Sequence, residues 1–311
     1  MEAELAFSTG DLAHTRFSVS PMWEVVTSVR TLLTTPTPSL HRPWVEQVLP
    51  RVRSTGLGLL AKLIPPTGYL PDFLTPTPKT AFPTLDSELA AIAATPASVI
   101  RTELAVLDMD LSDVDLSHLT AEIETYWELA LAPYWARIRT VLEADVFHRA
   151  RQVAEHGSAH LLNDLHASVR WDNDTLLLVR RQCAIVRDRP GSGLILIPSI
   201  FAWPHVLTRS VAPDPPQLAY PARAVGTVWE KRSGTDNTAI AAVIGKSRAL
   251  LLAELESPAS TTQLAQRAGL SAAGVSQHLT ALRDAGLVTA HRAGHSVLYA
   301  RTAIADSLLT A

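Results

Sequence analysis

The side chains best suited to recognising a partner share one face of a helix that the sequence predicts over residues 272–285 of the 311-residue chain. That face carries Ala272, Ala273, Ser276, Gln277, Thr280 and Arg283. A helix fits the major groove of DNA, where an amide can pair bidentately with adenine and a hydroxyl with several bases. We therefore expect Gln277 and Ser276 to contact bases, whereas Arg283 is better placed for a phosphate.

Four further residues complete the candidate interface. Ser271 lies directly before the helix, and His278 lies within it. His278 fits either base readout or a packing or phosphate-contact role, and the second interpretation has at least equal weight. Arg292 and His295 lie in a basic turn with His291, where a contact with the minor groove is expected.

A preceding helix and a tight turn must position this face. Ser260 and Gln263 have the spacing of a capping box, which predicts that a helix begins at about Thr261. Gly269 can adopt the left-handed conformation that ends such a helix. Two helices joined by a short glycine-containing turn form a helix-turn-helix.

The second helix is predicted to be capped by Ser271 and closed by Gly286. Its inward face is apolar at i, i+4 and i+7, which are Val275, Leu279 and Leu282. Two short strands follow, over about 287–291 and 296–301, and predict a hairpin of the kind called a wing.

This region resembles the arsenic-repressor (ArsR/SmtB) type of bacterial transcription factor. The matching residues are Gln263-Leu264-Ala265, Gly269-Leu270-Ser271, Val275-Ser276-Gln277-His278-Leu279, Leu282-Arg283-Asp284-Ala285-Gly286-Leu287-Val288 and Val297-Leu298-Tyr299. The resemblance implies a winged helix that binds double-stranded DNA. Two departures weaken the expected contacts: Ala273 and Gly274 replace common hydroxyl residues, and the wing is poorer in Arg than in many relatives.

The N-terminal part also resembles part of a known group of proteins. It resembles a group of arsenic-repressor-type regulators in which an uncharacterised domain of about 220 residues precedes the winged helix. The residues that carry this resemblance are Asp11-Leu12-Ala13, Thr15-Arg16-Phe17, Ser20-Pro21-Met22-Trp23-Glu24, Trp203-Pro204 and Tyr220-Pro221-Ala222-Arg223. The resemblance brings no ligand with it.

Composition and charge set limits on the class of protein. The net charge is −3, but residues 245–311 hold six Lys and Arg against four Asp and Glu, so the positive end coincides with the predicted winged helix. A single cysteine, Cys183, excludes an internal disulfide framework and fits a reducing cytoplasm. We find no signal peptide and no apolar run long enough for a membrane span.

The order of predicted elements indicates an α+β protein. A mostly helical N-terminal domain with a small β region is expected over residues 1–235, and a winged helix-turn-helix over residues 236–311. A helix over about 42–64 contains Pro50, which is expected to break or kink it, and a helix over about 119–155 should kink at Pro133. The Pro- and Thr-rich stretch 65–83 is interpreted as an ordered surface loop.

The sequence offers little support for enzyme chemistry. Gly191-Ser192-Gly193 lacks the spacing of a nucleophile elbow, and there is no phosphate-binding glycine loop. Cys183 fits a buried strand residue better than a nucleophile. We therefore predict that the protein is not an enzyme and needs no cofactor.

A metal-sensing role is a more specific alternative than an enzyme. His156, His160 and Asp164 are spaced four residues apart, but Gly157-Ser158 argues against one continuous helix, so ordinary surface histidines are the better interpretation and no metal site is predicted. The aromatic residues of the N-terminal part offer either an apolar ligand pocket or simply its core. These are Trp23, Trp44, Trp127, Trp135, Phe201, Trp203 and Tyr220.

Taken together, these patterns predict a cytoplasmic transcriptional regulator that binds operator DNA as a homodimer. We expect a repressor controlled by an organic small-molecule effector, with no membrane partner. The alternatives are a metal-responsive repressor and a winged helix that serves protein interaction without binding DNA.

Overall fold

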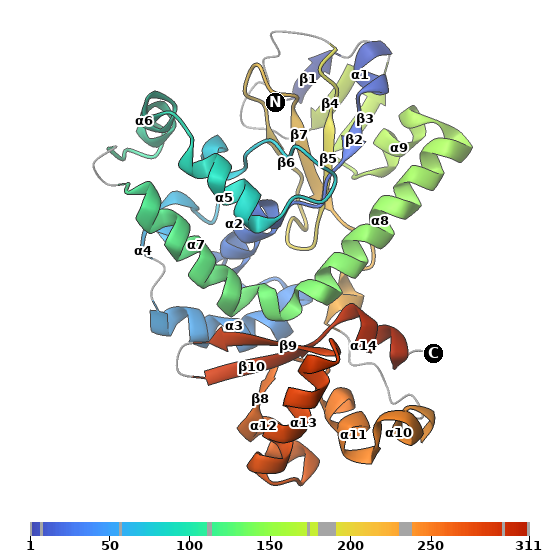
Figure 1. Ribbon diagram of the computed structural model, residues 1–311. Helices are drawn as coiled ribbons and strands as arrows, with labels where there is room; N and C mark the ends of the chain where they lie inside the picture. Colours follow the sequence, from blue (N-terminus) through green and yellow to red (C-terminus); the bar gives the residue numbers. More distant parts are fainter. Residues whose placement is uncertain are drawn as a thin grey trace. The chain divides into compact units, whose positions relative to one another are not determined.

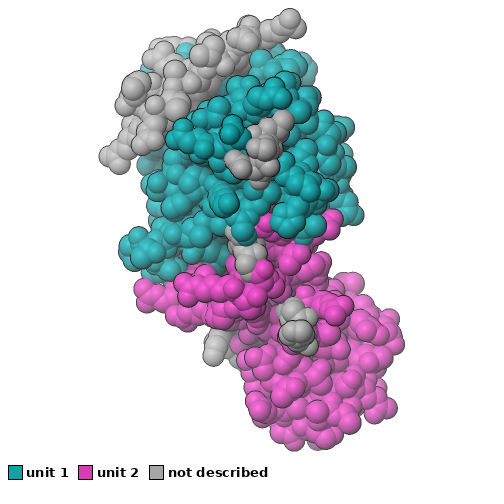
Figure 2. Space-filling view, turned by 90° about the vertical axis from the view of Figure 1, so that its left-hand side faces the viewer, with its two compact units in different colours: residues 1–39, 58–121, 141–225 teal, residues 40–57, 122–140, 226–311 magenta. Residues whose placement is uncertain are grey.

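A computed structural model describes residues 2–6, 9–55, 58–110, 114–172, 175–179, 191–229, 238–293 and 296–309. The chain divides into two compact units (Figure 2). Unit 1 comprises residues 1–39, 58–121 and 141–225, and unit 2 comprises residues 40–57, 122–140 and 226–311. Two N-terminal segments thus cluster with the C-terminal part, and the domain boundary expected at residues 235 and 236 stays a prediction.

A four-stranded sheet forms the centre of unit 1, in the order β2-β5-β7-β6. Its strands are β2 (Arg16–Phe17), β5 (Ile195–Ser199), β7 (Gln217–Pro221) and β6 (Leu207–Arg209). The first three run parallel and β6 is antiparallel to β7. Every residue of β5 and β7 is buried, as expected for strands of a parallel sheet that is covered on both faces.

A second, antiparallel sheet of unit 1 has the order β1-β4-β3. Its strands are β1 (Glu2–Ala6), β4 (Thr175–Val179) and β3 (Val169–Asp172). Strands β3 and β4 pair as an antiparallel hairpin within the small β region that the sequence predicted. Leu176 and Leu178 of β4 share one apolar core with Leu196 of β5 and Leu218 of β7, so the two sheets pack together.

Helices surround these sheets (Figure 1). The helices of unit 1 are α1 (Thr9–Ala13), α2 (Pro21–Leu33), α4 (Gly58–Leu63), η2 (Asp72–Leu74), α5 (Leu85–Ala93), α6 (Ala97–Ala105) and α9 (Ser158–Asp164). Helix α2 is buried over almost its whole length, and its start is capped by the Ser20 side chain, which accepts a hydrogen bond from the Trp23 amide. The helices α7 (Leu116–Ala130) and α8 (Trp135–His156) each contribute residues to both units.

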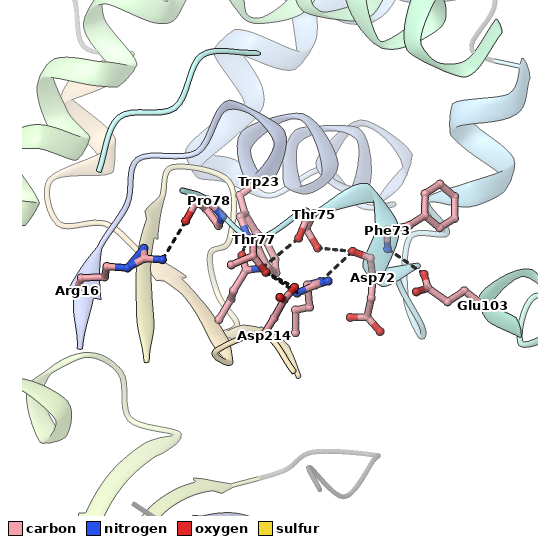
Figure 3. A network of polar contacts seen from close by, with 11 residues as sticks. Arg16, Trp23, Asp72, Phe73, Thr75, Thr77, Pro78, Glu103 and Asp214 are labelled. Atoms are coloured by element: carbon pink, nitrogen blue, oxygen red, sulfur yellow. Dashed lines mark hydrogen bonds and ion pairs between the residues drawn. The ribbon is translucent and has the colours of Figure 1, made fainter. Parts of the chain in front are cut away.

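The Pro- and Thr-rich stretch 65–83, predicted to be a surface loop, contains the 3-10 helix η2 and is buried at Pro71, Phe73, Leu74, Thr75 and Pro78, so the surface prediction is wrong for its middle part. Polar contacts tie it to the sheet of unit 1 (Figure 3). Arg209 of β6 donates to the Asp72 carbonyl at 3.0 Å and to the Thr77 hydroxyl at 2.9 Å. Gln217 of β7 donates to the Thr75 carbonyl at 3.1 Å and accepts from the Trp23 indole at 2.7 Å. These bonds anchor the stretch to β6 and β7.

Unit 2 contains the winged helix. Two short 3-10 helices are shared with unit 1, η1 (Ser39–His41) and η5 (Val225–Val228). The other elements of unit 2 are α3 (Arg42–Thr55), η4 (Ala132–Tyr134), α10 (Thr238–Ile244), α11 (Lys246–Glu254), β8 (Ala259–Ser260), α12 (Thr261–Ala268), α13 (Ala272–Asp284), β9 (Val288–Ala293), β10 (Ser296–Arg301) and α14 (Ala303–Leu308). The strands form an antiparallel sheet in the order β8-β10-β9. The predicted α+β class is confirmed.

Two proline predictions had different outcomes. Pro50 lies inside α3, which continues to Thr55, so the helix is not broken at Pro50. Pro133 does interrupt a helix, because the predicted helix over 119–155 is resolved into α7, η4 and α8. Cys183 lies outside the described residues.

Candidate nucleic-acid interface

Local capping interactions define the helix-turn-helix as predicted. The capping box is complete: the Ser260 amide donates to the Gln263 side chain at 2.9 Å, and the Gln263 amide donates to the Ser260 hydroxyl at 3.3 Å. Gly269 ends α12 with φ of 66°, a left-handed conformation that glycine adopts without strain. The Ser271 hydroxyl accepts from the Gly274 amide at 3.2 Å and starts α13.

Helix α13 presents one buried and one open face. Val275, Leu279 and Leu282 are buried in the core of the winged helix, with α11, α12 and α14 supplying further apolar residues. The candidate residues that are exposed on α13 or at its start are Ser271, Ala272, Ala273, Ser276, Gln277, Thr280 and Arg283. The fold therefore brings the polar residues together on a surface that the core leaves free.

His278 lies between these two faces. Its side chain is half-buried, and its Nδ1 atom is buried with no hydrogen-bond partner among the residues that the structure describes. This position favours packing at the edge of the helix over contact with a base.

The wing residues separate onto the two sides of the hairpin. Arg292 is exposed, and its cross-strand partner Val297 is exposed as well. His291 instead has its Nδ1 atom 3.3 Å from a carboxylate oxygen of Glu128 on α7. His295 lies outside the described residues.

Sequence reasoning missed the residues of α7 that contact the wing. Glu128 and His291 are 163 positions apart, and no local pattern in the sequence links them. The sequence did predict a helix over about 119–155, but not that residues 122–140 belong to the unit of the wing.

The distribution of charge favours unit 2 as the partner of a polyanion. Unit 2 has thirteen Lys and Arg against ten Asp and Glu, whereas unit 1 has fourteen against twenty. In the winged-helix part, five cations are exposed: Lys246, Arg248, Arg267, Arg283 and Arg292. Exposed cations of this kind neutralise phosphates and provide the sequence-independent part of DNA binding.

The histidine pair of the metal-sensing alternative lies in unit 1. His156 ends α8 and His160 belongs to α9, with Gly157 between them at φ of 82°, so the predicted interruption of the helix is confirmed. Asp164 does not turn to the pair but accepts from Arg149 at 2.6 Å. No group of three or more His, Cys, Asp or Glu that could hold a metal ion occurs in the described part of the chain.

None of the helices that the structure describes combines the length and the apolar character needed to cross a membrane. This finding matches the absence of a long apolar run in the sequence.

Comparison with known proteins gives two matches, to two separate segments of the chain. Residues 246–291 match the family described as a helix-turn-helix domain, which covers α11 to the middle of β9. Residues 119–226 match a family of unknown function (DUF5937). No curated protein and no solved structure matches the chain. The chain is thus similar to helix-turn-helix proteins in the region that carries the open face of α13.

Proposed function

We propose that the protein is a sequence-specific DNA-binding transcriptional regulator of the arsenic-repressor type, acting in the cytoplasm as a homodimeric repressor. The observation that carries the proposal is the open polar face of α13 within a segment that matches a helix-turn-helix domain. In such domains the second helix enters the major groove and its N-terminal residues contact base edges. Gln277 and Ser276 lie in the first half of α13, where such contacts occur.

The homodimer follows from the modest charge of one winged helix. A net of +3 on unit 2 supports only a few phosphate contacts, and affinity for DNA depends on the number of phosphates neutralised. Two copies on a near-palindromic site double that number. Half-sites about 10 bp apart, centre to centre, match the spacing of one helical turn.

We further propose that the effector is an organic molecule that binds unit 1. The supporting observation is the buried face of α2, where Glu24 is wholly enclosed and its Oε2 atom has no hydrogen-bond partner among the described residues. Oε1 already accepts from the Ile200 amide, so an organic molecule with a hydrogen-bond acceptor would satisfy the proton that the buried carboxyl group carries. In a thermal-shift screen, stabilisation by zinc, nickel, cadmium or arsenite, but by no organic compound, would favour the metal-responsive alternative.

Gln277→Ala tests the assignment of α13 to base readout. The variant loses an amide that pairs with one base, so it should weaken binding to the preferred duplex by about 1–3 kcal/mol and leave binding to random DNA unchanged. Fluorescence anisotropy titrations on both duplexes measure the two affinities.

Arg292→Ala is the matched comparison in the wing. A phosphate contact carries no sequence information, so this variant should weaken binding to both duplexes and reduce the slope of log affinity against log salt by about one. If Gln277→Ala also weakens binding to both duplexes equally, Gln277 does not read a base.

A further inference from the structure

The wing has two faces with different surroundings. Residues paired directly across an antiparallel hairpin share a face, and neighbours along each strand alternate between the faces. His291 pairs with Leu298, and Arg292 pairs with Val297. One face of the wing tip therefore carries His291 and Leu298, and the opposite face carries Arg292 and Val297.

The face with His291 and Leu298 is covered by residues of unit 2 that precede the winged helix by more than a hundred positions. Leu298 is 2% exposed and forms a small apolar cluster with Leu129 of α7, apart from the core of the helix-turn-helix. Beside it, Glu128 contacts the His291 ring at 3.3 Å. Helix η4 lies against both β9 and β10.

Strand β8 covers only the base of the wing. It pairs with β10 at Leu298 and Tyr299, so the residues nearer the tip belong to a two-stranded ribbon. An isolated two-stranded hairpin is marginally stable in water and gains stability from packing on a third element. The end of α7 and the following η4 supply that packing here.

We propose that Glu128 and Leu129 are positioning residues for the wing. They hold the inner face of the hairpin and direct the face of Arg292 to solvent, where a nucleic acid can reach it. Both residues lie within the segment that matches the family of unknown function, so that segment contributes to the DNA-binding unit itself. The consequence for DNA binding rests on the function proposed above, whereas the contact itself does not.

Hydrogen–deuterium exchange on the full-length protein tests the contact without DNA. Leu298→Ala removes the apolar side chain that packs on Leu129, and Val297→Ala removes its exposed neighbour on the other face. We expect the backbone amides of residues 291–293 and 296–298 to exchange at least about tenfold faster in Leu298→Ala, because deleting a buried leucine side chain loses burial and leaves a cavity. Those amides should change less than about twofold in Val297→Ala, and the amides of α13 should keep their wild-type rates in both. Equal rates at the wing tip in the two variants, or faster exchange throughout α13, would overturn the proposal.

The two glutamates of α7 provide the test with DNA. Glu124 and Glu128 are both exposed on the same helix, and of the two only Glu128 contacts the wing residues that the structure describes. Replacing either by Ala removes one negative charge, which by itself favours binding to a polyanion. We expect Glu124→Ala to bind DNA as tightly as the wild type or slightly more tightly, and Glu128→Ala to bind about two- to fivefold more weakly, the size of an exposed ion pair.

If Glu128→Ala gains affinity as Glu124→Ala does, Glu128 does not position the wing. A wild-type protein that binds no DNA would refute the proposed function alone, and the exchange rates would still decide whether α7 holds the wing.

Discussion

Asp145→Ala should lower the free energy of unfolding of unit 1 by about 3–5 kcal/mol, the range expected when one partner of a buried charge network is removed. Asp145 of α8 accepts hydrogen bonds from the Tyr220 hydroxyl at 2.7 Å and from the Arg223 amide at 3.0 Å. Its side chain is fully buried, and the Arg149 guanidinium lies 3.9 Å away. The variant leaves the buried Tyr220 hydroxyl and the part-buried Arg223 amide without this acceptor. Arg149 then keeps only Asp164 among the carboxylates that contact it in the described residues.

Denaturant unfolding followed by tryptophan fluorescence measures this loss. Glu155→Ala is the matched control on the same helix, because Glu155 forms an exposed ion pair with Arg151. It should change the midpoint little. Equal losses in the two variants would show that Asp145 does not anchor the Tyr220-Pro221-Ala222-Arg223 segment to α8.

The stability of unit 1 should fall as the pH rises from about 5 to 8, and Glu24 should account for much of the fall. Burial raises the pKa of Glu24 from 4.5 to about 8, although hydrogen bonds from Ser199 and from the Ile200 amide act in the opposite direction. The folded state therefore keeps a proton that the unfolded state releases above pH 4.5. A group whose pKa is raised by folding makes its full contribution to the stability of the folded state below the pKa that it has in the unfolded state. That contribution is lost as the pH rises through the pKa that it has in the folded state.

Glu24→Gln tests this directly, because glutamine keeps the acceptor for the Ile200 amide and cannot ionise. One pKa unit corresponds to about 1.4 kcal/mol, so the pH dependence removed by the substitution is on the order of 4 kcal/mol. Burial raises the pKa of Glu88 to about 7, so a smaller dependence of the same sign should remain. Unfolding midpoints measured at several pH values give the slope of stability against pH for each variant. Asp86→Asn, at an exposed position, is the control. A slope unchanged in Glu24→Gln would contradict the assignment.

Local signals in the sequence were sufficient for the helix-turn-helix. Ser260 with Gln263, Gly269 and Ser271 each act within four residues of the chain, so capping chemistry alone predicts where α12 and α13 begin and end. The apolar spacing of α13 then determined which of its faces is open.

The features that were not predicted depend on contacts between distant residues. Strand β2 is only two residues long and exists because Arg16 and Phe17 pair with Ile195 and Leu196. A two-residue segment has no periodicity from which pairing can be predicted. The contact of His291 with Glu128 is of the same kind: the sequence indicated a basic wing but not that one of its faces is covered.

In α3, packing outweighed the local signal of a proline. A proline removes one hydrogen bond and clashes with the preceding turn, which predicts a break. The helix nevertheless continues from Arg42 to Thr55, and Trp44, Val45, Val48 and Val52 are buried along it. Tertiary packing of this apolar face offsets the local cost of Pro50, which itself is exposed.

The central claim is that the open face of α13 reads a DNA sequence, and selection from a random duplex library with the full-length protein tests it most directly. The predicted result is an enriched near-palindromic motif with half-sites about 10 bp apart. The selected duplex should bind at least about 10³-fold more tightly than a scrambled duplex at physiological salt. A library without any enriched motif, or equal affinity for the selected and scrambled duplexes, would contradict the claim.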